Sequence, residues 1–189
     1  MKFKHNFLLV DIEATGLDLN HHEIIQLAAI ELDKNTLAEV KRFNTFVKPT
    51  NWDNRDPEAM EVNQITWEQL QDSPDLKTAL TNFSQEFSQE VTPTNYGGNL
   101  DFNLLKVSYE RLGLDYPFDY HVFNLWPLCY TYMASQNLLT NEAKFTGFSL
   151  DDTIAHFGIN SPQNRHDALT DCELEAEVMR NIFSQLNFS

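Results

Sequence analysis

The sequence is short of positive charge, which limits the kinds of surface that the chain can present. It carries 13 Lys and Arg against 28 Asp and Glu, a formal net charge of −15 over 189 residues. A protein that follows a nucleic acid over many phosphates normally has a basic face, whereas the basic residues here are scattered along the chain. A long electrostatic groove is therefore not expected, and much of the acidic excess is typical of a solvated surface.

Cysteines and long apolar runs are also scarce. Cys129 and Cys172 lack the spacing of metal ligands and are expected to be reduced, buried thiols of a cytoplasmic protein. No apolar run is long enough to span a membrane, and the run near the N-terminus is broken at Asp11, so a signal peptide is not expected. Without repeats, linkers or low-complexity tracts, a single domain over residues 1–189 is the simplest interpretation.

The most informative stretch is residues 7–17, FLLVDIEATGL, in which an apolar run predicts a buried strand that ends in two carboxylates. Residues i and i+2 of a strand point to the same face, so Asp11 and Glu13 would lie side by side. Two neighbouring buried anions repel each other, and a divalent cation relieves that repulsion. A solvated strand end is the alternative, because Asp-x-Glu is a common sequence.

Taken in order, the chain predicts an α/β fold. Strands over 7–11, 23–32 and 40–47 have short connections and should form an antiparallel meander. A strand over 91–96 leads through glycines into a helix, a βα unit that favours parallel pairing. The remaining predicted elements are a helix over 76–87, a helix over 100–112, a strand over 120–123, and helices over 126–135, 150–157 and 169–186.

Three polar sites stand next to these elements. Asp11 and Glu13 end the first strand, Asp101 follows the fourth, and His166 and Asp171 are near the start of the last helix. Ligands of open α/β sheets gather at the carboxyl ends of strands, and four carboxylates suit Mg²⁺ or Mn²⁺. Two such ions about 4 Å apart can orient an attacking water in phosphodiester hydrolysis, and a histidine beside them can accept its proton.

In this order and spacing, the motifs resemble the DEDDh branch of the DEDD superfamily of 3′→5′ exonucleases, which includes proofreading exonucleases and ribonuclease T. The resemblance rests on residues 11–16, DIEATG, on Asp101, and on His166 placed five residues before Asp171. The sister branch has a tyrosine four residues before that aspartate, where this chain has Asp167. The resemblance covers nearly the whole chain and implies a ribonuclease-H-like mixed sheet of five strands flanked by helices.

The resemblance also implies a metal site and a reaction. Two divalent ions, Mg²⁺ or Mn²⁺, would be bound by four carboxylates: Asp11, Glu13, Asp101 and Asp171. His166 would be the general base. The implied reaction is hydrolysis at the 3′ end of single-stranded DNA or RNA, with release of nucleoside 5′-monophosphates. Homodimers occur in this superfamily, so the resemblance leaves room for one here.

Substrate contacts are implied near the first motif. Glu13 and the backbone near Ala14 and Thr15 would hold the terminal 3′ hydroxyl group, and Leu17 would wedge against the last base. His166 would also contact the substrate. Many members have a His-Asn pair before the second aspartate, where this chain has Tyr96-Gly97. An aromatic residue followed by glycine is similar to RNA exonucleases of the branch and favours RNA or short single strands.

Each of these residues also has an ordinary explanation when it is taken singly. Asp101 could cap a helix, and Asp171 could be a first-turn carboxylate that the helix dipole favours. Arg165 could contact a phosphate or be only a surface residue. At the level of the whole chain, two other functions stay open. One is a phosphodiesterase for dinucleotides or very short oligonucleotides, which suits the acidic charge, and the other is a non-catalytic nucleic-acid-binding module of the same fold.

Overall fold

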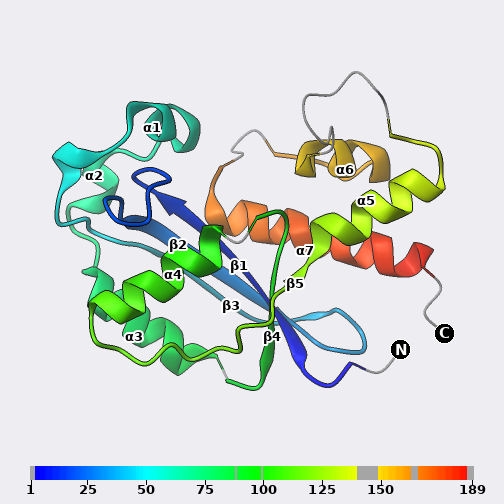
Figure 1. Cartoon of the computed structure of the whole chain (residues 1–189), viewed down its shortest axis with the longest axis horizontal. Helices are drawn as coiled ribbons and strands as arrows, with labels where there is room; N and C mark the ends of the chain where they lie inside the picture. Colours follow the sequence, from blue (N-terminus) through cyan, green and yellow to red (C-terminus); the bar gives the residue numbers. More distant parts are fainter. Residues whose placement is uncertain (1–2, 88, 99, 140–148, 163–165, 187–189) are drawn as a thin grey trace.

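A five-stranded sheet with the strand order β3-β2-β1-β4-β5 forms the centre of the computed structural model (Figure 1). Residues 3–87, 89–98, 100–139, 149–162 and 166–186 are described. The strands are β1 (Asn6–Ala14), β2 (Ile24–Leu32), β3 (Glu39–Phe46), β4 (Val91–Asn95) and β5 (Phe123–Asn124). The first three strands form an antiparallel meander, whereas β4 pairs parallel with β1 and β5 pairs parallel with β4. The mixed sheet confirms the fold predicted from the sequence.

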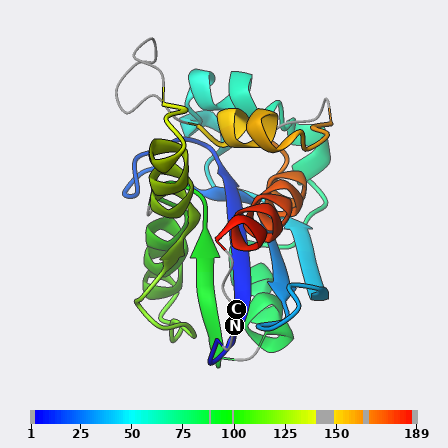
Figure 2. The same ribbon diagram turned by 90° about the vertical axis from the view of Figure 1, so that its right-hand side faces the viewer.

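Helices cover both faces of this sheet. They are α1 (Pro57–Asn63), α2 (Trp67–Leu70), α3 (Leu76–Glu86), α4 (Leu100–Arg111), α5 (Leu125–Ser135), α6 (Leu150–Phe157) and α7 (Ala168–Gln185), with a 3-10 turn, η1 (Trp52–Asn54), before α1. One apolar core joins the sheet to α5, α6 and α7, and a second core joins its other face to α3 and α4. Figure 2 shows α7 crossing one face of the sheet beside β1.

The alternation of side chains along β1 decides where the carboxylates of this strand point. Phe7 and Leu9 belong to the core under α7, whereas Leu8 and Val10 belong to the core under α3 and α4. Because side chains alternate along a strand, Asp11 and Glu13 continue the face of Phe7 and Leu9. Both carboxylates therefore face the side of the sheet that α7 covers.

The fifth strand is where the sequence prediction was wrong. Instead of a strand over 120–123, the described part of the chain has the two-residue β5, which keeps only Phe123 of that range and pairs with Thr94 and Asn95. Tyr120 lies outside it and is 81% exposed. Aromatic and β-branched residues made 120–123 look like a strand, but pairing is available only beside the short end of β4.

The cysteines, the absence of a predicted membrane span and Arg165 are the remaining features expected from the sequence. Both cysteines are free and buried, as expected from the sequence. No helix in the described ranges is both long and apolar enough to cross a membrane. Arg165 lies outside the described residues, and the cytoplasmic location stays a prediction.

Candidate metal centre

Glu13, His166 and Asp171 form a compact group that could hold a metal ion. Each offers one ligand atom, and these three atoms lie within 4.8 Å of one another. Glu13 is the next-to-last residue of β1, and Asp171 is a buried residue in the first turn of α7. His166 is exposed and lies just before α7. The structure thus brings Glu13 together with two residues that follow it by more than 150 positions in the sequence.

Asp11 and Asp101 belong to the same charged cluster. Burial raises the pKa of Asp11 well above its ordinary value, and the nearby charge of Asp101 raises it further. Glu175, Glu13 and Asp171 act on the same carboxyl group in the same direction. Such mutual repulsion requires close approach in a poorly solvated place. All four carboxylates that the sequence predicted as metal ligands are therefore neighbours in the fold.

Asp101 lies in the first turn of α4, one residue inside the helix, and does not act as its cap. Burial raises the pKa of Asp101 to about 6, although hydrogen bonds from Asn95 and from the backbone of Ile12 oppose this rise. The Nδ2 atom of Asn95 is 3.5 Å from Oδ2 of Asp101 and donates a shorter bond, 2.7 Å, to the carbonyl oxygen of Gly98. The end of β4 thus orders the turn that carries Asp101.

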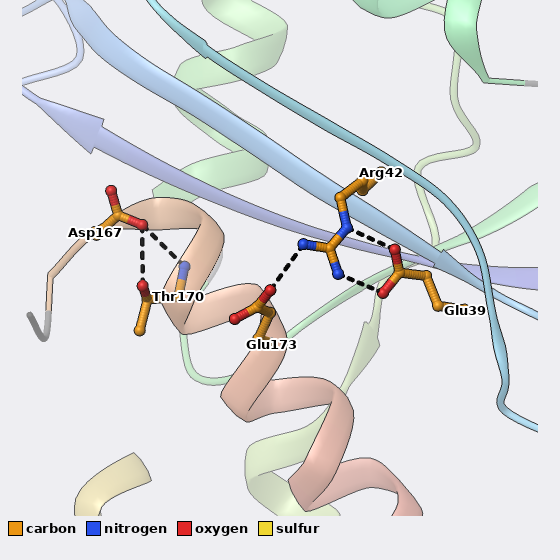
Figure 3. A network of polar contacts seen from close by, with 5 residues as sticks. All are labelled: Glu39, Arg42, Asp167, Thr170 and Glu173. Atoms are coloured by element: carbon orange, nitrogen blue, oxygen red, sulfur yellow. Dashed lines mark hydrogen bonds and ion pairs between the residues drawn. The ribbon is translucent and has the colours of Figure 1, made fainter. Parts of the chain in front are cut away.

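The start of α7 is held by Gln26 on β2, which lies directly opposite Glu13 in the β1-β2 ladder. The amide nitrogen of Gln26 donates to Oδ2 of Asp167 at 2.9 Å, and its oxygen accepts from the backbone N–H of Ala168 at 3.2 Å. Asp167 in turn caps the helix by accepting from the backbone N–H of Thr170 at 3.0 Å (Figure 3). Asp167, which replaces the tyrosine of the sister branch, is thus a structural residue here.

His166 reaches the cluster through an uncommon backbone conformation. Its φ angle is +64°, in the left-handed region that non-glycine residues rarely adopt. Strain of this kind persists only where the surroundings determine the conformation, and it is frequent at functional sites. The hydrogen bonds from Gln26 to Asp167 and Ala168 hold the two residues that follow His166, and they can thereby maintain its backbone conformation.

A second connection between the sheet and α7 lies further from the cluster. Arg42 of β3 forms two hydrogen bonds with Glu39, of 2.6 and 2.7 Å, and a third, of 2.8 Å, with Glu173 of α7 (Figure 3). These side chains are about half exposed, so the pairs contribute little to stability by themselves. They nevertheless connect β3, the edge strand of the sheet, to α7.

The loop after Glu13 is ordered mainly by Thr15. The backbone N–H of Thr15 donates to the carbonyl oxygen of Glu23, and its hydroxyl accepts from the N–H of Glu23, both at 2.9 Å. The carbonyl oxygen of Thr15 accepts from Asp56, and that of Ala14 accepts from the side chain of Asn63. Thr15 is buried, and its backbone N–H is bonded to Glu23, so Thr15 stabilises the loop without facing the solvent.

A cavity of about 280 Å³ opens beside the cluster, and its lining includes Glu13, Ala14 and Asp101. Its wall includes three large apolar side chains that are nonetheless solvent-exposed: Leu17 at 71%, Val62 at 50% and Leu100 at 38%. Apolar surface of this kind is frequent at binding sites. An apolar wall next to carboxylates suits a ligand with a flat apolar part and a phosphate, the latter held through bound cations.

The donor set fits divalent cations. Carboxylate oxygens with one imidazole are the hard ligands that Mg²⁺ and Mn²⁺ accept. Asn95 is only 1% exposed, and within the described part of the chain its Oδ1 atom has no hydrogen-bond partner. An acceptor buried beside Asp101 without a protein donor is suited to the hydration shell of a cation.

The sequence interpretation missed Glu175, a fifth buried carboxylate. It is 3% exposed, one helical turn after Asp171, and its Oε1 atom accepts a 3.0 Å hydrogen bond from the backbone N–H of Tyr96. A signal was available, because Glu175 falls among Cys172, Ala176 and Met179 on the apolar face of the last helix. A carboxylate at such a place is rarely solvated.

Taken together, the mixed sheet and the acidic cluster at the carboxyl ends of β1 and β4 define a ribonuclease-H-like nuclease fold. The chain belongs to the exonuclease family, whose model matches residues 8–179. This assignment confirms the family resemblance found in the motifs.

Individual relatives and solved structures agree with this family. The PolC-type DNA polymerase III of Thermotoga maritima is 27% identical over 173 residues, which cover 91% of this chain and 11% of that protein. The chain thus spans about a tenth of the length of that curated relative. Cell-death related nuclease 4 has a TM-score of 0.79 at 14% identity, with 95% of this chain and 64% of that one covered. The nuclease domain of 3'hExo, a DEDDh family member bound to rAMP, has a TM-score of 0.74 at 17% identity, with coverage of 97% and 94%.

Proposed function

We propose that this chain is a metal-dependent 3′→5′ exonuclease that removes nucleoside 5′-monophosphates from single-stranded DNA or RNA. The observation that carries this proposal is the meeting of four carboxylates and His166 beside an apolar pocket. Membership of the exonuclease family supports the reaction class. We further propose that residues 1–189 act as a single exonuclease domain.

The roles in the site follow from the chemistry of the residues. Asp11, Glu13, Asp101 and Asp171 would hold two divalent ions. When bound, such ions neutralise the scissile phosphate and make an attacking water more acidic. His166, exposed and within 4.8 Å of Glu13 and Asp171, would accept the proton of that water.

The pocket would receive the 3′-terminal nucleotide. The apolar side chains of Leu17, Val62 and Leu100 would pack against its base. Glu13 and the backbone near Ala14 would lie close to its 3′ hydroxyl group. The backbone N–H of Thr15 would not bind this hydroxyl group, because it already donates to the carbonyl oxygen of Glu23. The names of the relatives, a DNA polymerase and a nuclease bound to rAMP, support both polymers as substrates. A homodimer stays a prediction.

A second candidate is a phosphodiesterase for dinucleotides or very short oligonucleotides. The net charge of −15 favours it, because a long polyanion would be repelled by most of the surface. A cavity of about 280 Å³ holds about one nucleotide. This candidate uses the same residues and differs only in the length of the substrate.

The test is a time course on matched single-stranded DNA and RNA oligonucleotides labelled at the 3′ or the 5′ end, with Mn²⁺ or with a chelator. A ladder from the 5′-labelled strand and immediate mononucleotide from the 3′-labelled strand would support the proposed direction. Asp11→Ala and His166→Ala should each reduce hydrolysis at least a hundredfold. A matched control is Asp119→Ala, an exposed aspartate that pairs with the neighbouring His121.

The outcomes separate the candidates. Full activity of Asp11→Ala or His166→Ala would contradict the assigned roles. Hydrolysis that slows as the oligonucleotide lengthens would favour the short-substrate phosphodiesterase. Metal binding without release of mononucleotide from any substrate would point to a non-catalytic module of the same fold.

A further inference from the structure

Glu175 is a buried carboxylate that the proposed reaction does not yet use. It lies four residues after Asp171 on α7, and residues at this spacing project from the same face of a helix. Like charges at this spacing destabilise a helix even in water, and Glu175 is only 3% exposed. A carboxylate in this place therefore destabilises the metal-free fold, which indicates that Glu175 has a function that offsets this cost.

The hydrogen bond to Tyr96 gives the first part of such a role. Tyr96 directly follows β4 and begins the connection to α4, the helix that carries Asp101. Its backbone N–H donates to Oε1 of Glu175 at 3.0 Å. Its phenol lies 2.7 Å from Oγ1 of Thr153 and donates to the carbonyl oxygen of Ser149. The residue after β4 is thus fastened to α7 by its backbone and to α6 by its side chain.

This hydrogen bond links the two halves of the acidic cluster. Asp171 is carried by α7, whereas Asp101 is carried by the β4-α4 unit, and Glu175 connects α7 to the first residue after β4. The neighbouring Gly97 is held separately, because its N–H donates to Oδ1 of Asn124 at 3.2 Å. Loss of the Glu175 contact would release one of the ties that set the position of Asp101 relative to Asp171.

The hydrogen bond alone does not require a negative charge. The side-chain oxygen of a glutamine could lie at the same place and accept a hydrogen bond from the backbone N–H of Tyr96. What glutamate adds is a negative charge close to the cluster, and the charge of Glu175 does raise the pKa of Asp11. The same field that opposes ionisation of a carboxyl group attracts a cation to the same place.

We propose that Glu175 is a positioning residue of the metal centre, which fastens the β4-α4 connection to α7 and strengthens divalent cation binding by its charge without being a ligand. The inference rests on the proposed metal-dependent function. The buried charge of Glu175 thus destabilises the metal-free protein, and the same charge makes the cation bind more tightly.

The test compares Glu175→Gln, which keeps the acceptor and removes the charge, with Glu175→Leu, which removes both. Glu177→Gln is the matched control, because Glu177 is on the same helix, half exposed, and paired with Arg180 at 2.6 Å. Mn²⁺ affinity is measured by titration calorimetry without nucleic acid, and the melting temperature is measured with a chelator. We expect Glu175→Gln to bind Mn²⁺ about tenfold more weakly, as for other residues that support metal ligands, and to melt no lower than wild type without metal. Glu177→Gln should match wild-type affinity.

The positioning role has its own readout in the metal-free protein. The amide proton of Tyr96 is followed by NMR, because a hydrogen bond to a carboxylate moves its resonance downfield. The shift should decrease in Glu175→Gln and decrease further in Glu175→Leu. If the leucine variant does not fold, the glutamine variant still decides both readouts.

Three results would overturn parts of the inference. Wild-type Mn²⁺ affinity in Glu175→Gln would refute the charge role, and an unchanged Tyr96 resonance in both variants would refute the positioning role. A wild-type protein that binds no Mn²⁺ would refute the metal centre itself, and the charge role with it. That last result is distinct from the first, in which wild type and variant bind equally.

Discussion

The side-chain amide of Gln26 lies 2.9 Å from Oδ2 of Asp167, a contact that spans 141 positions of the sequence. The same amide group accepts the backbone N–H of Ala168 through its oxygen. Gln26 is 1% exposed and stands opposite Glu13 on the neighbouring strand. One buried side chain thus decides where α7 begins, and with it how His166 is presented to Glu13.

Replacing Gln26 by leucine should therefore destabilise the protein and misplace His166. Leucine is similar in size but leaves Asp167 and the N–H of Ala168 without their partner. Each buried group left unsatisfied costs about 1–3 kcal/mol, so we expect a loss of about 2–4 kcal/mol in urea unfolding. Asn44→Ala is the control, because it removes only the 3.2 Å bond between Gln26 and Asn44. An equal loss in both variants would contradict the proposed importance of the α7 start.

Gly16 gives a second prediction, which rests on space. A Cβ atom at this position would lie 2.3 Å from the Cε1 and Nδ1 atoms of the His22 ring. The ring cannot move freely, because its Nδ1 atom accepts the backbone N–H of Asp18 at 3.0 Å. Gly16→Ala should therefore displace the loop that carries Leu17 and lower kcat/KM for an oligonucleotide about tenfold.

The double variant Gly16→Ala/His22→Ala provides the control for this steric argument. Removal of the imidazole makes room for the new methyl group, so activity should rise above that of Gly16→Ala alone. His22→Ala by itself should lose only the single hydrogen bond to Asp18, which is worth about 1 kcal/mol. Wild-type activity of Gly16→Ala would show that the ring gives way.

The sequence predicted most of the sheet and the four carboxylates because both leave local signals. Apolar periodicity and turn residues predicted β1 to β4 within a few residues. Asp11, Glu13, Asp101 and Asp171 each lie within the first or last four residues of an element. The two-residue β5 left no such signal, since its position depends on where β4 ends.

Contacts between distant residues were the other part that could not be predicted. Gln26 was part of a recognisable stretch, but its bonds to Asp167 and Ala168 exist only after the sheet and α7 have packed. Asn95 is buried beside Asp101 for the same reason. Glu175 was visible as a charge among apolar helix positions, yet its partner, the N–H of Tyr96, comes from another part of the chain.

The pKa of Asp101 predicts how the metal-free protein responds to pH. Its folded value of about 6 is raised above the ordinary value of 3.8, so protonated Asp101 favours folding. The stabilisation is complete below about pH 4 and is lost as the pH rises through about 6. Asp101→Asn should remove this loss, which we expect to be about 3 kcal/mol.

The measurement is urea unfolding of wild type and Asp101→Asn with a chelator between pH 4 and pH 7. The difference between the two proteins reports Asp101 together with its effect on Asp11, whose pKa the charge of Asp101 raises. Exposed carboxylates with lowered pKa values, such as Asp33 and Asp75, contribute equally to both proteins. A difference in unfolding free energy that stays constant across this range would show that Asp101 is not the titrating group. Saturating Mn²⁺ should raise the stability of wild type at pH 7, by about 2.7 kcal/mol at one hundred times its dissociation constant.

Leu17 provides a test of the pocket that leaves the carboxylates untouched. Its side chain is 71% exposed and lines the cavity with Val62 and Leu100, so Leu17→Ala removes little buried area and should change stability by less than about 0.5 kcal/mol. Loss of its contact with a base should lower kcat/KM about 10- to 100-fold, since an apolar contact of this size is worth about 1–3 kcal/mol. Leu138→Ala is the control, because Leu138 is 42% exposed and lies outside the lining of the cavity. Equal activity of the two variants would mean that the terminal base does not use this wall. A larger loss on a dinucleotide than on a long strand would show that the pocket supplies most of the binding energy for short substrates.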